Sequence, residues 1–254
     1  MAHDYVLHKE RIGDVSLKIV PDPEPLNPRT EWDNAAIMAC WHRRYRLGDT
    51  IGPTALADAI RASRDYRDTW DRFDCAHDGS LDLFDPADIL VALPKCRDII
   101  WLPLYLYDHS GITISTGRFA CPWDSGQVGY VFMTKAQVLA ELGKPGATRL
   151  SPRLRERAIA LIRAEVANYD RYLTGDVWGY VVEDDDGAHL DSCWGFFGSA
   201  YCIEEGRSTA RWLAAQRERA RATAFAEEAE QARPDMYRPA YANDAPRTEI
   251  GSNS

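Results

Sequence analysis

Two turns rich in polar residues carry most of the side chains that could do chemistry. The first contains Asp108, His109 and Ser110, and the second contains Asp124 and Ser125. Asp and His side chains can exchange protons or hold a divalent metal ion, and a small hydrolase relies on one of these abilities. If both turns lie at one end of a sheet, their side chains form a candidate site.

We divide the residues of this site by the chemistry of their side chains. Asp108, His109 and Asp124 are the candidate catalytic residues. The candidate binding residues are polar or aromatic side chains in the same turns or further along the chain: Ser110, Trp123, Ser125, Gln127 and Asp176. We call the seven residues of the turns themselves the two-turn cluster: Asp108, His109, Ser110, Trp123, Asp124, Ser125 and Gln127.

A purely structural role for these turns is the competing interpretation. The aspartate of an Asp-Ser-Gly turn commonly accepts a hydrogen bond from the backbone two residues on. We favour this interpretation, so no cofactor is expected. A divalent metal ion with unknown ligands is the alternative.

A second segment, Ser192-Cys193-Trp194-Gly195-Phe196, superficially resembles the surroundings of a papain-type nucleophilic cysteine. That chemistry requires a histidine far downstream, and no histidine follows His189. We therefore interpret Cys193 as a buried cysteine in a strand.

Residues 74–85 partly match a calcium-binding loop, with acidic residues at the first, fifth, ninth and twelfth positions and glycine at the sixth. The third position is Ala76, however, and the twelfth is Asp85, where a longer bidentate glutamate is usual. We expect a solvated acidic turn.

The basic segment His42-Arg43-Arg44-Tyr45-Arg46 could grip phosphate or stack on a base. A single cluster makes few phosphate contacts, and the chain carries a net charge of −9. We expect instead that this segment ends a strand and that its arginines pair with nearby acids.

Composition excludes several classes of function. With 39 acidic and 30 basic residues, general binding to nucleic acid or to an anionic membrane is not expected. The chain lacks GxxxxGKS, GxGxxG, HExxH and GxSxG, so nucleotide-dependent, zincin and α/β-hydrolase activities lack their minimum motifs. No apolar run is long enough for a membrane helix.

The six cysteines contain no CxxC pair, and the chain opens with Met-Ala-His-Asp rather than an apolar signal segment. These features predict free thiols and a cytoplasmic location.

Helix signals are clearest where proline or a capping residue precedes an apolar pattern. The strongest is Ser151-Pro152, which predicts a helix that ends near Gly175. A helix is also expected from Pro53, running on through Trp70 and Phe73, and another from Thr134 to Gly143. After Gly206, a helix of about twenty-five residues is predicted, with an apolar face only in its first half.

Alternating and β-branched residues predict strands between these helices. Val15–Val20 is one strand, Ile99–Thr116 is a hairpin that turns at Asp108-His109-Ser110-Gly111, and a strand pair is expected around Gly126–Met133. Val177–Val182 and Cys193–Tyr201 form a further pair, which we expect to join the same sheet.

The predicted fold is therefore α+β, with a mainly antiparallel sheet, packed helices and a long C-terminal helix. We expect one globular domain over residues 1–205 and the C-terminal helix over 206–233. Residues 234–254 are Pro, Asn, Asp, Arg and Ser without periodicity, which predicts a disordered tail.

Three stretches, at residues 104–111, 121–130 and 169–180, resemble an uncharacterised group of proteins found in phages and integrative elements. The resemblance spans roughly residues 15 to 200. It implies a mobile-element origin and an accessory, host-facing role, and it supplies no catalytic residues.

Two functional hypotheses follow. The first is an accessory protein without catalytic activity that binds a macromolecular partner, such as a host protein, in host interaction or counter-defence. The second is a small metal-assisted or acid–base hydrolase centred on Asp108, His109 and Asp124. The mutual geometry of these three residues distinguishes the two.

Overall fold

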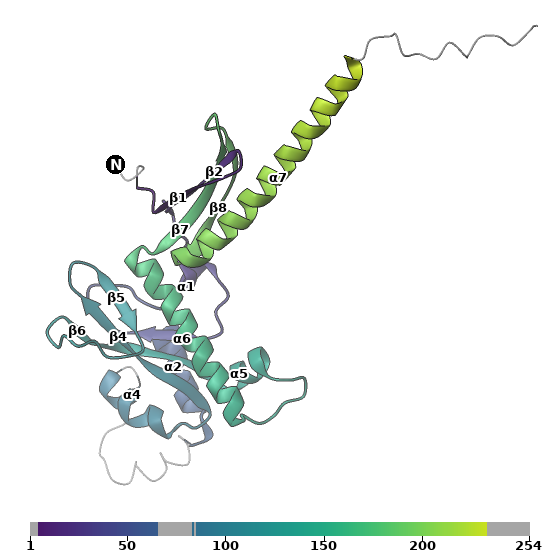
Figure 1. The fold of residues 1–254 in the computed structure, drawn as a ribbon. Coiled ribbons are helices and arrows are strands. Elements are labelled where there is room, and N and C mark those ends of the chain that lie inside the picture. Colours follow the sequence, from purple (N-terminus) through teal and green to yellow (C-terminus); the bar gives the residue numbers. More distant parts are fainter. Residues whose placement is uncertain (1–4, 66–82, 84, 233–254) are drawn as a thin grey trace, which may run out of the picture.

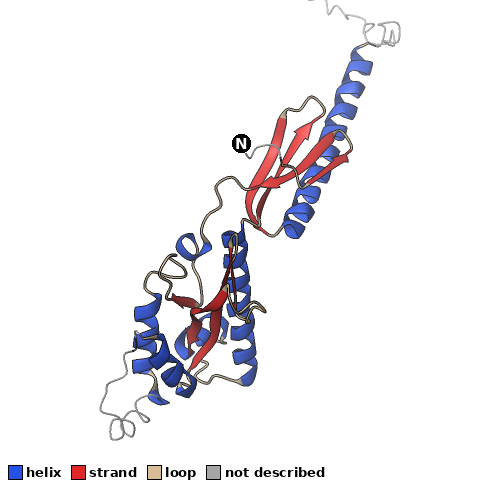
Figure 2. Ribbon diagram, turned by 90° about the vertical axis from the view of Figure 1, so that its left-hand side faces the viewer, coloured by secondary structure: helices blue, strands red, loops and turns tan. Residues whose placement is uncertain are grey.

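The computed structural model describes residues 5–65, 83 and 85–232. Within these residues the chain forms two four-stranded antiparallel sheets with packed helices and a long C-terminal helix, which confirms the expected α+β class (Figure 1). We call one the terminal sheet, because its strands come from both ends of the chain, and the other the central sheet. In Figure 2 the terminal sheet lies beside α7 in the upper part of the view, and the central sheet lies below it.

The terminal sheet has the strand order β1-β2-β7-β8. Its strands are β1 (His8–Ile12), β2 (Val15–Pro21), β7 (Val177–Asp184) and β8 (His189–Phe197). Alternate residues of β2 are buried, as expected for a strand with one face on a core. Helix α7 (Ser199–Gln231) covers that face and contributes Cys202 and Ala210 to the core.

The expectation that the β7–β8 hairpin joins the same sheet as the Ile99–Thr116 hairpin is wrong. Strand β7 pairs with β2 from Val15↔Asp184 to Pro21↔Trp178. The C-terminal helix also begins at Ser199, so the last residues of the expected Cys193–Tyr201 strand are helical. Gly198, at φ 89°, ends the strand. Gly206 lies inside the helix, where it contacts β2: an added Cβ at this position would stand 2.8 Å from Leu17 Cδ1, and glycine avoids this clash.

The central sheet has the order β3-β6-β4-β5. Its strands are β3 (Ile37–Cys40), β6 (Ser125–Thr134), β4 (Ile99–Asp108) and β5 (Ile112–Ser115). Helix α6 (Pro152–Thr174) packs on one face, and α2 (Gly52–Ala62) and α4 (Pro86–Ala92) pack on the other. Because both faces of the sheet are covered, consecutive residues of β6 are buried. The sequence predicted a pair of strands around Gly126–Met133, but the structure has the single strand β6 there.

Several element boundaries lie where the sequence places them. Ser151 caps α6 through the Leu154 amide, and Gly175 ends it at φ 75°. Helix α5 (Lys135–Leu142) starts with a capping box between Thr134 and Gln137. Helix α2 ends at Ala62, and the expected continuation through Trp70 and Phe73 lies outside the described residues.

Residues 22–176 leave and re-enter the terminal sheet at adjacent positions. Pro21 pairs with Trp178, and the Asp22 amide donates to the Val177 carbonyl at 2.9 Å. Everything between, including the short helix α1 (Pro28–Glu31) and the central sheet, is therefore an insertion between two neighbouring strands. None of the described helices is long and apolar enough to cross a membrane.

Candidate functional site

The two turns of the two-turn cluster meet at one end of the central sheet. Tyr107 pairs with Ser125, and the next rung is a hydrogen bond from the Asp108 amide to the Asp124 carbonyl at 2.8 Å. The β4–β5 turn is tight, with Ser110 at φ 59°, a conformation that few residues other than glycine adopt. The pairing of β4 with β6 and the tight β4–β5 turn therefore bring the three candidate catalytic residues to one end of the sheet.

His109 and Asp124 form a contact at the surface. His109 Nδ1 lies 3.4 Å from Asp124 Oδ2, and the two side chains are 64% and 39% exposed. The Cys121 thiol donates to the same carboxylate oxygen at 3.6 Å. This arrangement can pass a proton between imidazole and carboxylate, but the thiol faces the carboxylate rather than the imidazole that would activate it.

The carboxylate of Asp108 interacts with residues of the basic segment that follows β3. Its carboxylate pairs with the Arg44 guanidinium and accepts a hydrogen bond from the Tyr45 hydroxyl at 3.2 Å. The Tyr45 ring stacks on His42, with the ring centroids 4.9 Å apart. The expectation that the arginines of segment 42–46 pair with nearby acids is confirmed for Arg44.

A shallow hollow of about 350 Å³ lies beside these residues. Its walls include Trp41, His42, Arg44, Asp108, Asp124 and Gln127. Trp123 stands at its rim with 92% of its surface exposed. Ser125 and Gln127 bond to main-chain carbonyls, those of Cys121 and Gly129.

Asp176 has different partners. Its carboxylate accepts a hydrogen bond from Trp178 Nε1 at 2.6 Å and lies 3.8 Å from Arg171 Nε. Its carbonyl accepts from the Gly198 amide. These contacts fix the turn between α6 and β7, and none of them is with Asp108, His109 or Asp124. The structure therefore gives Asp176 a local structural role.

Metal ligation requires several oxygen, nitrogen or sulfur donors around one point. In the part of the chain that the structure describes, no group of three or more His, Cys, Asp or Glu residues is placed to hold an ion. Within the two-turn cluster, His109 and Asp124 form an exposed imidazole–carboxylate contact beside the arginine-bound Asp108.

Two other sequence motifs have different outcomes. Cys193 lies in β8 as expected, but it is exposed, so the expectation of a buried cysteine is wrong. Strand β8 is only partly covered, and among the described residues it lies at the edge of the terminal sheet. Most of the calcium-like segment 74–85 lies outside the described residues.

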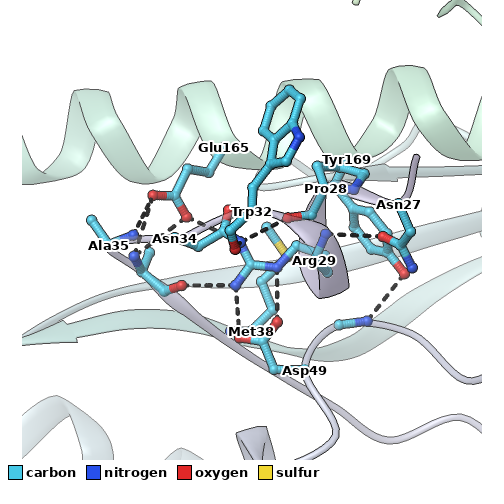
Figure 3. A network of polar contacts seen from close by, with 12 residues as sticks. Asn27, Pro28, Arg29, Trp32, Asn34, Ala35, Met38, Asp49, Glu165 and Tyr169 are labelled. Carbon is cyan, nitrogen blue, oxygen red and sulfur yellow. Dashed lines mark hydrogen bonds and ion pairs between the residues drawn. The ribbon is translucent and has the colours of Figure 1, made fainter. Parts of the chain in front are cut away.

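A buried polar network around Arg29 was not foreseen from the sequence (Figure 3). The Arg29 side chain is 1% exposed and makes two bonds to the Asp49 carboxylate, at 2.8 and 2.7 Å. It also donates to Glu165 at 3.0 Å and to the Ala36 carbonyl at 2.7 Å. Burial alone would lower the pKa of Arg29, but the bonds with Asp49 and Glu165 raise it above its usual value.

This network joins three segments that are far apart in the sequence. Asp49 accepts from the Met38 amide, and Glu165 accepts from the Ala35 amide at 2.9 Å. Tyr169 on the same helix as Glu165 accepts from the Gly48 amide at 3.1 Å. Each nitrogen of the Arg29 guanidinium donates at least one hydrogen bond within the protein, so we assign the network a structural role. No spacing signal connects Arg29 with Glu165 across 136 positions.

A second feature without a sequence signal is a groove lined by Trp32 from the segment after α1 and by Trp194 and Phe197 from β8.

Comparison of the chain with protein-family models, with curated proteins and with solved structures found no match.

Proposed function

We propose that this protein acts by binding a macromolecular partner, and that the outer part of α7 is a contact surface. The observation that carries the proposal is the exposure of this helix. Every residue from 218 to 232 is exposed, and Phe225 is 75% exposed. In Figure 1 this part of α7 extends past the terminal sheet.

The inner part of α7 is fixed to the sheet. Gly206 and Ala210 pack on the core, and Arg217 and Arg221 pair with Asp14 at 2.7 and 2.8 Å. The segment 222–231 beyond it spans roughly 15 Å at 1.5 Å per residue. Most helical stability in proteins comes from packing an apolar face, so a helical turn without packing partners is suited to receive one.

The outer segment has a face that could receive a protein. Ala222, Phe225 and Ala229 recur at the i, i+3 and i+7 spacing of one helix face. At 3.6 residues per turn, Arg219 and Glu228 lie on the two flanks of this face, so charges of both signs border the apolar stripe. A protein partner suits this mixture better than nucleic acid, whose phosphates require clustered basic residues.

The resemblance to proteins of phages and integrative elements supports a proposal about the origin and setting of this protein. We propose an accessory role for a mobile element, with a host protein as the partner and the host cytoplasm as the place of action. Two of the three resembling stretches, 104–111 and 121–130, form the two-turn cluster.

A photo-crosslinking experiment tests the proposal. Phe225 of the full chain is replaced by the photoreactive phenylalanine analogue benzoylphenylalanine. The cells that produce this chain are then irradiated. We expect a covalent adduct of defined mass, because the analogue would lie against the partner. Tyr201 on the same helix, exposed but next to Phe196, is the control position. Absence of any adduct specific to position 225 would contradict the proposal.

The hydrolase remains a second candidate, supported by the convergence of Asp108, His109 and Asp124 beside a hollow. A titration with zinc or manganese, followed by calorimetry in two buffers, tests its metal-assisted form, because binding to imidazole and carboxylate releases protons. We expect no tight binding, since Arg44 already neutralises Asp108. Micromolar or tighter affinity that disappears in Asp108→Asn would favour the hydrolase.

A further inference from the structure

The groove between the segment after β2 and the end of β8 has the features of a peptide-binding site. It has a volume of about 490 Å³, within the range of ligand pockets. Its apolar wall is formed by Leu26, Trp32, Trp194 and Phe197, and Asp22 and Glu24 also line it. Leu26, Trp32 and Trp194 are 62%, 44% and 43% exposed, so the wall is accessible.

The two tryptophan rings are held in place. The ring of Trp194 lies directly on Gly179, where an added Cβ would stand 2.1 Å from it. Trp32 packs edge-on against Phe197, with the centroids 4.8 Å apart and the planes at 73°. Rings that are already fixed lose little conformational entropy when a ligand binds.

The carboxylates give the groove a negative side. Asp22 accepts hydrogen bonds from the Glu24 and Gly195 amides, each at 3.0 Å, which fixes its position. Glu24 is exposed, and no basic side chain among the described residues pairs with it. A ligand that carries arginine or lysine complements this side, and the tryptophan faces also attract cations.

The backbone of β8 excludes strand addition at this point. Tyr180 pairs with Cys193 and Trp178 with Phe196, so Trp194 and Gly195 together oppose Gly179 and form a bulge. Gly195 has φ 82°, and its amide is already bonded to Asp22. A ligand must therefore bind by packing side chains rather than by extending the sheet. Aromatic grooves of this kind suit the polyproline II conformation, which needs no backbone ladder.

We propose that this groove binds a proline-rich, basic peptide segment of another protein. Prolines pack on the rings of Trp32 and Trp194, and an arginine or lysine beside them pairs with Glu24 and Asp22. The site is separate from the outer part of α7, so its test is independent of the crosslinking at Phe225.

The test measures binding of the synthetic peptide Arg-Pro-Leu-Pro-Pro-Leu-Pro-Arg to the full chain by calorimetry. We expect saturable binding that weakens as salt concentration rises. Two control peptides, one with glutamate in place of both arginines and one with alanine in place of every proline, should bind at least roughly tenfold more weakly.

Variants locate the binding. Trp32→Ala and Trp194→Ala should each weaken it by roughly tenfold or more, and Glu24→Gln by roughly two- to fivefold. Trp212→Ala removes an exposed tryptophan that does not line the groove and should leave the affinity unchanged. Glu24 is exposed, so its variant reports on binding even if a tryptophan variant fails to fold. Absence of saturable binding, equal binding of either control peptide, or unchanged affinity in Trp194→Ala and Glu24→Gln would overturn the proposal.

Discussion

Arg29 shows how much a single buried charge depends on its partners. It holds two carboxylates from different segments, and it is itself almost completely buried. Removing one member of such a group leaves the others without compensation, which costs far more than the net contribution of the group to stability.

We therefore expect Arg29→Met to lower the free energy of unfolding by about 3–5 kcal/mol, because Asp49 and Glu165 would remain close together without a cation. Urea unfolding measures this change. Arg44→Met is the matched control, since Arg44 pairs with Asp108 at the surface and should contribute about 1 kcal/mol or less. Equal unfolding curves for Arg29→Met and the unmodified chain would show that the network is not stabilising.

The cysteines differ in reactivity according to burial. Among the described residues all five cysteines are free. Burial raises the pKa of both Cys40 and Cys202 to about 12, whereas Cys193 is exposed. Because the thiolate is the reactive form, Cys40 and Cys202 should resist modification in the folded protein at neutral pH.

We predict that a thiol reagent modifies Cys193 rapidly and that Cys193→Ser removes one rapid equivalent, whereas Cys202→Ser removes none. Absorbance of the released chromophore follows the reaction. Six thiols should react after denaturation without reductant, since no cysteine is expected to be paired. A count of four or fewer would contradict that expectation.

At the scale of elements, the sequence predicts what local chemistry determines. The boundaries of α6 depend on Ser151, Pro152 and Gly175, which act within one turn of the helix. The two turns at Asp108 and Asp124 converge because β4 and β6 are neighbouring strands, so this part of the candidate site was predictable. The pairing of β7 with β2 and the contact of Arg29 with Glu165 join distant segments, and no local pattern specifies them.

Helix α7 combines a docked half and an exposed half, and the two should respond differently to change. A chain that ends after Thr223 should unfold at the same urea concentration as the full chain, because the residues it loses from 224 to 232 are all exposed. A large loss of stability in the shortened chain would show that the outer half also packs on the protein.

In the docked half, Gly206→Leu should lower the free energy of unfolding by about 1–3 kcal/mol, because Leu17 and Tyr180 leave no room for a side chain.

At the scale of the whole molecule, the two sheets have separate cores. The cores on the two faces of the central sheet are built from residues between 35 and 173, whereas the core of the terminal sheet uses residues from 12 to 19 and from 178 to 214. A chain of residues 22–176 therefore contains all of the strands and helices that its own cores require.

We predict that residues 22–176, produced alone, fold with a cooperative thermal transition. Circular dichroism follows the melting, and Arg29→Met in the same fragment is the control that should lower its midpoint. A fragment that melts without a transition would show that the central sheet depends on the terminal one.

The insertion of residues 22–176 between β2 and β7 also sets an order of events on the ribosome. The β1–β2 hairpin emerges first, yet an isolated two-stranded hairpin is only marginally stable in water. Its partner β7 appears only after the whole insertion has been made, roughly 8–30 s later at about 5–20 residues per second. During this interval the edge of β2 has no partner, and the central part can fold before the first strands do. Nascent chains should therefore acquire protease resistance in their middle before their beginning, with Val15, Leu17 and Ile19 as the surface that a chaperone would meet.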